Sequence, residues 1–187
     1  KPVSKKINDY LKKYSGRIIL LSNNTTYNDD AKTYSLSTSD ISNSLKIDSW
    51  FKKLLSLEQQ ALTKINSKIK NVFFEGSIIA ACIDKLNHND NLFIGNSLSI
   101  RMLEQYTYNI DKKIKLYSNR GASGIDGLVS TALGISYANK SKRNILILGD
   151  VSFFYDLNAL LITHNYRINL SIVILNNNGG KIFKSLP

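Results

Sequence analysis

The stretches NILILGD (residues 144–150) and LSIVILNNNGG (residues 170–180) decide the fold of this chain. Each is an apolar, β-branched run that ends in a polar cluster, as buried parallel strands do. Asn177 follows Asp150 by 27 residues, which leaves room for one helix and two turns. That length fits a right-handed crossover between parallel strands. Both clusters are therefore expected at carboxyl ends of strands, where open α/β sheets bind ligands.

The two clusters contain hard oxygen donors: the Asp150 carboxylate, the Asn177 side-chain amide and the Gly179 carbonyl. Such donors suit Mg²⁺ held against a diphosphate, with water completing the octahedron. A Gly-Asp pair, a crossover of this length and paired asparagines are typical of thiamin-diphosphate enzymes. Taken alone, the spacing also fits a turn aspartate and an Asn-Gly loop, both of which are common after strands.

Further strands and helices alternate along the same part of the chain. The apolar pattern predicts strands at 91–94, 114–118, 144–148 and 170–175. Helices are expected to run to Arg101, to Ala138 and over 156–165, with Asp156 and Asn158 in a structural, helix-starting role. Alternating strands and helices predict an α/β fold, a parallel doubly wound sheet with flanking helices.

The N-terminal part is organised differently. Residues 17–21 are predicted to form a short buried strand, and the Ser-, Thr-, Asn- and Asp-rich residues 22–45 a loop or linker. We place a domain boundary there, between 1–42 and 43–187. Two helices are expected to follow. One begins at Asp48, carries Trp50 on an apolar face that packs in a core, and extends past Ile65. The other follows Glu75-Gly76 and runs to about Leu86.

The composition excludes several classes of protein. The net charge is +11, but the lysines are scattered at helical spacing, as on solvated helix faces, so we expect no nucleic-acid partner. No apolar stretch reaches the ~20 residues of a membrane span, and no secretory signal is visible. The single cysteine, Cys82, lies in an apolar helical pattern and is expected in the core. His88 and His164 lack metal-ligand spacing, which favours surface or capping roles.

A glycine-rich stretch, SNRGASGIDG (residues 118–127), leads directly into an apolar helical pattern and offers an anion site at a helix start. This stretch forms a pattern that is specific for one family when it is combined with three others: GNSLSIR (95–101), DVSFFYDLN (150–158) and IFKSLP (182–187). The chain resembles the 2-succinyl-5-enolpyruvyl-6-hydroxy-3-cyclohexene-1-carboxylate synthases, closely over 95–187 and loosely over 1–90. These are transferases of menaquinone and phylloquinone biosynthesis. In the resemblance, residues 1–42 are the end of a central domain, and 43–187 are a cofactor-binding domain that is incomplete at its C-terminus.

The resemblance implies a cofactor and its ligands. Thiamin diphosphate is expected with Mg²⁺ or Mn²⁺, and Asp150, Asn177 and Gly179 are the implied metal ligands. Gly149 lets the backbone approach the diphosphate, and Ser152 donates a hydrogen bond to it. Ile125 matches the apolar residue that wedges under the bent cofactor; without the family it would be a core residue at a helix start.

The resemblance also implies the substrates, 2-oxoglutarate and isochorismate. 2-Oxoglutarate is decarboxylated, and the resulting succinyl carbanion equivalent adds to isochorismate in a conjugate addition. The implied substrate-binding residues are Ser97, Arg101, Arg120, Ile182, Phe183 and Leu186. Arginine forks suit carboxylates, although a surface ion pair would also explain Arg101 and Arg120.

No residue of this chain is expected to be catalytic, because the family's catalytic glutamate comes from a separate N-terminal domain that this chain lacks. We therefore expect a fragment that supplies the metal and diphosphate half of the site and is inactive alone. The complete enzyme is expected to be a cytoplasmic homodimer or homotetramer, with a plastid as the alternative compartment. Two other functions stay open: another thiamin-diphosphate enzyme, of acetolactate synthase or 2-oxoacid decarboxylase type, and a non-catalytic binding module or remnant.

Overall fold

The computed structural model describes residues 5–16, 20–21, 35–36, 49–108 and 110–185. The chain divides into two compact units, residues 1–59 and 60–187. The predicted boundary near residue 43 lies outside the described residues and stays a prediction. In the first unit, helix α1 (Lys5–Lys13) precedes two short strands, β1 (Leu20–Leu21) and β2 (Ser35–Leu36). The two strands pair in parallel, so the region predicted to be entirely loop contains a strand.

Helix α2 (Ser49–Asn71) is the long helix that the apolar pattern predicted. No residue of α2 is buried, and Trp50 is 67% exposed. The prediction that Trp50 packs in a core is therefore wrong. The predicted cap, Asp48, lies outside the described residues.

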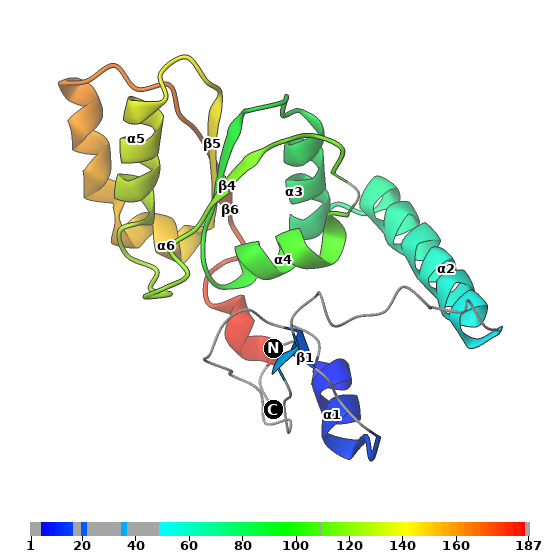
Figure 1. Ribbon diagram of the computed structural model, residues 1–187. Coiled ribbons are helices and arrows are strands. Elements are labelled where there is room, and N and C mark those ends of the chain that lie inside the picture. Colours follow the sequence, from blue (N-terminus) through cyan, green and yellow to red (C-terminus); the bar gives the residue numbers. More distant parts are fainter. Residues whose placement is uncertain (1–4, 17–19, 22–34, 37–48, 109, 186–187) are drawn as a thin grey trace. The chain divides into compact units, whose positions relative to one another are not determined.

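The second unit is built on four parallel strands (Figure 1). They are β3 (Asn91–Ile94), β4 (Lys115–Tyr117), β5 (Asn144–Gly149) and β6 (Ser171–Leu175). Their spatial order is β4-β3-β5-β6. Phe93 pairs with Leu146, and Gly149 pairs with Leu175. The predicted parallel sheet is confirmed, with strand limits within one residue of those expected.

The helices that flank this sheet are α3 (Glu75–Asp84), α4 (Leu98–Tyr106), α5 (Leu128–Ala138) and α6 (Asp150–Tyr155), followed by the 3₁₀ helices η2 (Leu157–His164) and η3 (Lys181–Ser185). The segment predicted as one helix over 156–165 is therefore different: α6 begins directly at Asp150, and η2 follows it. The Asp156 carboxylate accepts hydrogen bonds from the backbone N–H and the hydroxyl of Ser130, at 2.7 and 2.9 Å. Asp156 thus ties the end of α6 to α5, in line with its predicted structural role.

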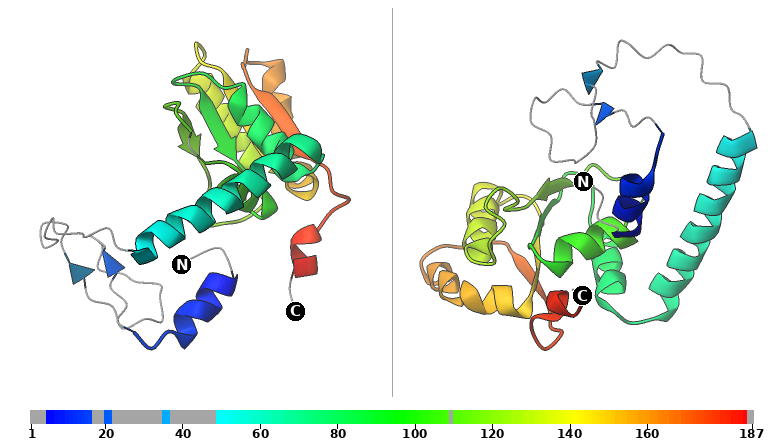
Figure 2. Two further views of the ribbon diagram at one scale, coloured as in Figure 1. Left: turned by 90° about the vertical axis from the view of Figure 1, so that its right-hand side faces the viewer. Right: turned by 90° about the horizontal axis from the view of Figure 1, so that it is seen from below.

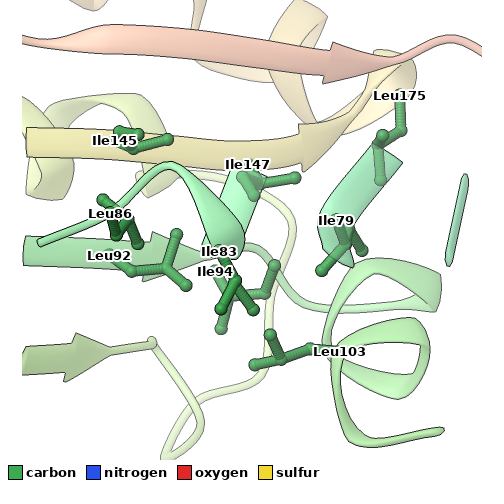
Figure 3. Packing of buried hydrophobic residues seen from close by; sticks show 9 residues of the cluster. All are labelled: Ile79, Ile83, Leu86, Leu92, Ile94, Leu103, Ile145, Ile147 and Leu175. Atoms are coloured by element: carbon green, nitrogen blue, oxygen red, sulfur yellow. The ribbon is translucent and has the colours of Figure 1, made fainter. Parts of the chain in front are cut away.

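The strands bury side chains on both faces, because successive residues of a strand point to opposite sides. On one face, Leu92, Ile94, Ile145, Ile147 and Leu175 pack with side chains of α3 and α4 (Figure 3). On the other face, Phe93, Leu146 and Leu148 pack with α5, α6 and η2. The sheet is therefore covered on both sides (Figures 1 and 2).

The strand order creates a crevice between the ends of β3 and β5. Helix α4 leaves β3 toward one face of the sheet, whereas α6 and η2 leave β5 toward the other. Ligands bind at such a switch point in open α/β sheets. Gly95 allows the two strands to approach here, because a Cβ on it would lie 2.9 Å from Cβ of Leu148.

Candidate functional site

A cavity of about 140 Å³ lies at the carboxyl ends of β3, β5 and β6. Its lining comes from five segments of the chain that are separated in sequence. The residues are Glu75, Asn96, Ser97, Leu98, Ser99, Ile125, Gly149, Asp150, Val151, Ser152, Leu175, Asn177, Gly180, Lys181, Ile182 and Phe183. Complete ligand pockets usually measure about 300–1,000 Å³. A cavity of this size has room for part of such a ligand, for example a diphosphate with its metal.

The residues at the ends of β5 and β6 bring the predicted metal ligands together. The Asp150 carboxylate accepts hydrogen bonds from the backbone N–H groups of Gly179, at 2.8 Å, and Val151, at 2.9 Å. The turn after β6 makes this approach possible, because Asn178, Gly179 and Gly180 all have positive φ. Asn177 lines the same cavity.

These donors fit a hard divalent cation. Among the described residues, no group of three or more His, Cys, Asp or Glu side chains could hold a metal. Asp150, Asn177 and Gly179 instead offer one carboxylate and two neutral oxygens. Mg²⁺ typically takes few protein ligands and completes its octahedron with phosphate oxygens and water.

The start of α6 fits a phosphate group. Gly149 has φ −76° and ψ 160°, a backbone conformation open to any residue. A Cβ added to Gly149 would meet no atom within 4 Å, so packing does not explain the glycine. A ligand that approaches the backbone at this point would explain why the residue is glycine. Ser152 is buried, and its hydroxyl has no hydrogen bond to the residues that the structure describes, so it is available to donate one to a ligand.

The glycine-rich loop is attached to the end of β3 by Asn96. The Asn96 side-chain N–H₂ group donates to the carbonyls of Asn119, at 3.1 Å, and Gly124, at 2.6 Å. Its buried Oδ1 has no hydrogen-bond partner among the described residues. These two bonds hold the segment that carries Ile125, which lines the cavity as predicted.

The predicted substrate-binding residues divide into three groups. Ser97, Ile182 and Phe183 line the cavity. Arg101 and Arg120 do not line it: Arg101 donates to the Ser97 carbonyl at 2.6 Å, and Arg120 is exposed in the glycine-rich loop. Leu186 lies outside the described residues.

Four polar residues of the cavity had no predicted role there: Glu75, Asn96, Ser99 and Lys181. Asn96 carried a signal, since it stands between Gly95 and Ser97 at a strand end. Glu75 carried none, because it begins α3 and lies 102 residues from Asn177, which it contacts. The sequence had predicted only that a helix follows Glu75 and Gly76.

Comparison with known proteins agrees with this geometry. Residues 97–185 match the thiamine pyrophosphate enzyme, C-terminal TPP binding domain. Over these residues the chain is similar to the cofactor-binding domain of thiamin-diphosphate enzymes. The matched segment includes every described residue of the predicted cofactor and metal sites, and thiamin diphosphate with a divalent metal is confirmed as the cofactor of this domain.

The similarity to one group within these enzymes extends over the whole chain. The chain is 39% identical to 2-succinyl-5-enolpyruvyl-6-hydroxy-3-cyclohexene-1-carboxylate synthase of Staphylococcus epidermidis. It is 37% identical to the synthase of Staphylococcus haemolyticus and 39% to that of Staphylococcus aureus. Each alignment covers 100% of this chain and 35% of the relative. The resemblance drawn from the motifs is confirmed, and the chain spans about a third of the length of these relatives.

The helices were also compared with the requirements of a membrane span. In the ranges that the structure describes, none combines the necessary length and apolar character.

Proposed function

We propose that the protein is a thiamin-diphosphate-dependent synthase that decarboxylates 2-oxoglutarate and adds the four-carbon remainder to isochorismate. The observation that carries this proposal is the convergence of eight predicted site residues on one cavity: Ser97, Ile125, Gly149, Asp150, Ser152, Asn177, Ile182 and Phe183. The whole-chain similarity to the staphylococcal synthases supports the choice of reaction. Their bacterial origin favours the menaquinone pathway over phylloquinone synthesis in a plastid.

The residues of β5 and β6 provide the cofactor anchor in this proposal. Asp150, Asn177 and Gly179 bind the metal, Mg²⁺ or Mn²⁺, while Gly149 and Ser152 contact the diphosphate. Bound thiamin diphosphate supplies nucleophilic addition to a 2-oxo acid and stabilises the carbanion equivalent left when CO₂ departs. Ile125 supports the cofactor in its bent form from the glycine-rich loop.

The remaining site residues bind and orient the substrates. Ser97 and the apolar pair Ile182 and Phe183 form the part of the substrate pocket that lies on this chain. Arg101 and Arg120 stand on the two segments that Asn96 joins, and their guanidinium groups are suited to substrate carboxylates. We propose that they reach the substrate from these positions.

The proposal includes a contribution from protein outside this chain. A cavity of about 140 Å³ holds only part of the cofactor. A separate N-terminal domain that supplies a catalytic glutamate would complete the site, in a homodimer or homotetramer.

The test is an assay for isochorismate consumption, followed by ultraviolet absorbance, with 2-oxoglutarate, thiamin diphosphate and Mg²⁺. It uses this chain with and without a separately produced N-terminal domain of a staphylococcal relative. We expect turnover in the mixture, and none when the chain carries Asp150→Ala. Turnover of pyruvate in place of 2-oxoglutarate would instead indicate an acetolactate synthase or decarboxylase. Absence of turnover with either acid would contradict the proposal.

A further inference from the structure

Besides Asp150, the cavity contains a second carboxylate, that of Glu75. Glu75 lies 102 residues before Asn177, a proposed metal ligand, and contacts it. Oε1 of Glu75 lies 3.4 Å from the side-chain nitrogen of Asn177. A carboxylate at neutral pH can only accept hydrogen bonds. The side-chain N–H₂ group of Asn177 must therefore face Glu75, which leaves the amide oxygen of Asn177 free for a cation.

The choice of amide orientation matters for a metal site. Asn177 offers one oxygen that binds a cation and one N–H₂ group that repels it, at opposite ends of the same planar group. Without a partner for the N–H₂ group, both orientations are accessible. A fixed acceptor on one side removes the unproductive orientation, as the outer partners of metal ligands do in other sites.

Glu75 is held firmly enough to act in this way. It is the first residue of α3, and the residue before it, Phe74, packs edge-on against Tyr106 of α4 with ring centroids 4.9 Å apart. The hydroxyl of Ser77 closes the helix start by bonding both the N–H and the carbonyl of Phe74. The backbone that carries Glu75 is therefore fixed on both sides.

We propose that Glu75 is a positioning residue that orients Asn177 for metal binding. The proposal rests on the proposed function, because it takes Asn177 as a ligand of the cofactor's metal. Its action is by hydrogen bonding, so an uncharged acceptor of the same shape can replace it. Removal of the acceptor weakens the metal site without disturbing Asp150 or Gly179.

The experiment measures Mn²⁺ binding rather than turnover. Mn²⁺ is titrated into the protein with saturating thiamin diphosphate, and free Mn²⁺ is followed by its electron paramagnetic resonance signal. We expect Glu75→Ala to raise the Mn²⁺ dissociation constant about 10- to 100-fold. Glu75→Gln, which keeps an acceptor oxygen, should stay within about threefold of the unsubstituted protein.

Two further variants separate orientation from other effects. Glu104→Ala removes an exposed glutamate of α4 outside the cavity and should leave the dissociation constant unchanged. In an Asn177→Ala background, Glu75→Ala should add less than twofold, because the residue through which it acts is gone. Melting curves without metal confirm that each variant is folded.

Each outcome bears on a definite claim. Equal Mn²⁺ affinity of Glu75→Ala and the unsubstituted protein would overturn the role of Glu75 and leave the proposed function intact. An equal loss in Glu75→Gln and Glu75→Ala would also overturn it, in favour of a charge effect. If the unsubstituted protein showed no Mn²⁺ binding that depends on thiamin diphosphate, the proposed function would fail, and the role of Glu75 with it.

Discussion

Ser97 has a backbone conformation that residues other than glycine rarely adopt. Its φ is 71° and its ψ is −127°, immediately before α4 begins. Such a conformation costs about 1–3 kcal/mol and persists where surrounding contacts enforce it. Here the Arg101 side chain bonds the Ser97 carbonyl, and Asn96 on the preceding position is fixed by the glycine-rich loop. The conformation directs the Ser97 segment along the cavity wall.

We expect the free energy of unfolding of Ser97→Gly to be about 1 kcal/mol higher than that of Ser97→Ala. Both variants lose the hydroxyl, but only glycine relieves the backbone strain. Urea denaturation followed by circular dichroism would measure the difference. Equal stabilities would show that the Ser97 conformation is not strained. Both variants should bind substrate more weakly if the hydroxyl has the proposed role.

Cys82 is a residue of α3 whose thiol is partly buried against the core between α3 and the sheet. Burial raises the pKa of the Cys82 thiol by disfavouring the thiolate. Below the ordinary thiol pKa, both folded and unfolded chains keep the proton, so the stability does not change with pH through this group. Above it, the unfolded chain loses the proton first, so the contribution of Cys82 to stability falls as pH rises toward the raised folded pKa.

The reactivity of Cys82 should follow the same pKa. At pH 8, a disulfide reagent should modify the folded chain several-fold more slowly than the chain in urea, because less thiolate is present. The rate in the folded chain should keep rising beyond the pH at which the rate in urea levels off. Identical pH profiles in the two states would contradict a raised pKa.

At the scale of elements, buried asparagines fix the amino ends of β3 and β5. The side-chain nitrogen of Asn91 donates to Oδ1 of Asn144 at 2.8 Å. Asn144 in turn donates to the carbonyls of Asn139, Lys142 and Asn169, at 3.2, 2.9 and 3.0 Å. These contacts join two strands to the loops beside them and fix their pairing, on which the alignment of the cavity residues depends.

Replacing Asn144 with alanine should therefore lower the free energy of unfolding by about 1–3 kcal/mol, because buried polar groups lose their partners. Asn87→Ala is the matched control. Its side chain is exposed, and the expected change is within about 0.5 kcal/mol. Thermal or urea unfolding of the two variants would test this, and similar values would argue that the network contributes little.

Local pattern was enough to predict the sheet and the polar residues that follow β5 and β6, whereas Ser97, Ile125, Ile182 and Phe183 were predicted only from the resemblance. The apolar runs of β3, β5 and β6 have sharp polar ends, so both the strands and the residues that follow them were predictable. The short helix α6 was missed, since six residues give no helical period to detect. Trp50 and Glu75 show the other difficulty: the exposure of one and the contact of the other with Asn177 depend on segments far away in the sequence.

At the scale of the whole molecule, a ligand in the cavity would contact several helices and strand ends at once. Thiamin diphosphate with Mg²⁺ should stabilise the folded chain, because a ligand that binds only the folded state shifts the equilibrium by mass action. At a free concentration 100 times its dissociation constant, the expected gain is about 2.7 kcal/mol. Differential scanning fluorimetry should show the shift with both components, and a chelator should abolish it. A shift that persists in the chelator would contradict a metal-dependent anchor.

The pairing of β6 has a mechanical consequence. In the described sheet, β6 is an edge strand with β5 as its one neighbour. Asp150 directly follows β5, and Asn177 and Gly179 follow β6, so a cation held by all three would link the last strand to the body of the sheet. The ion would thus secure an edge strand, which is open to fraying on one side, and binding of the cofactor would also stabilise the sheet.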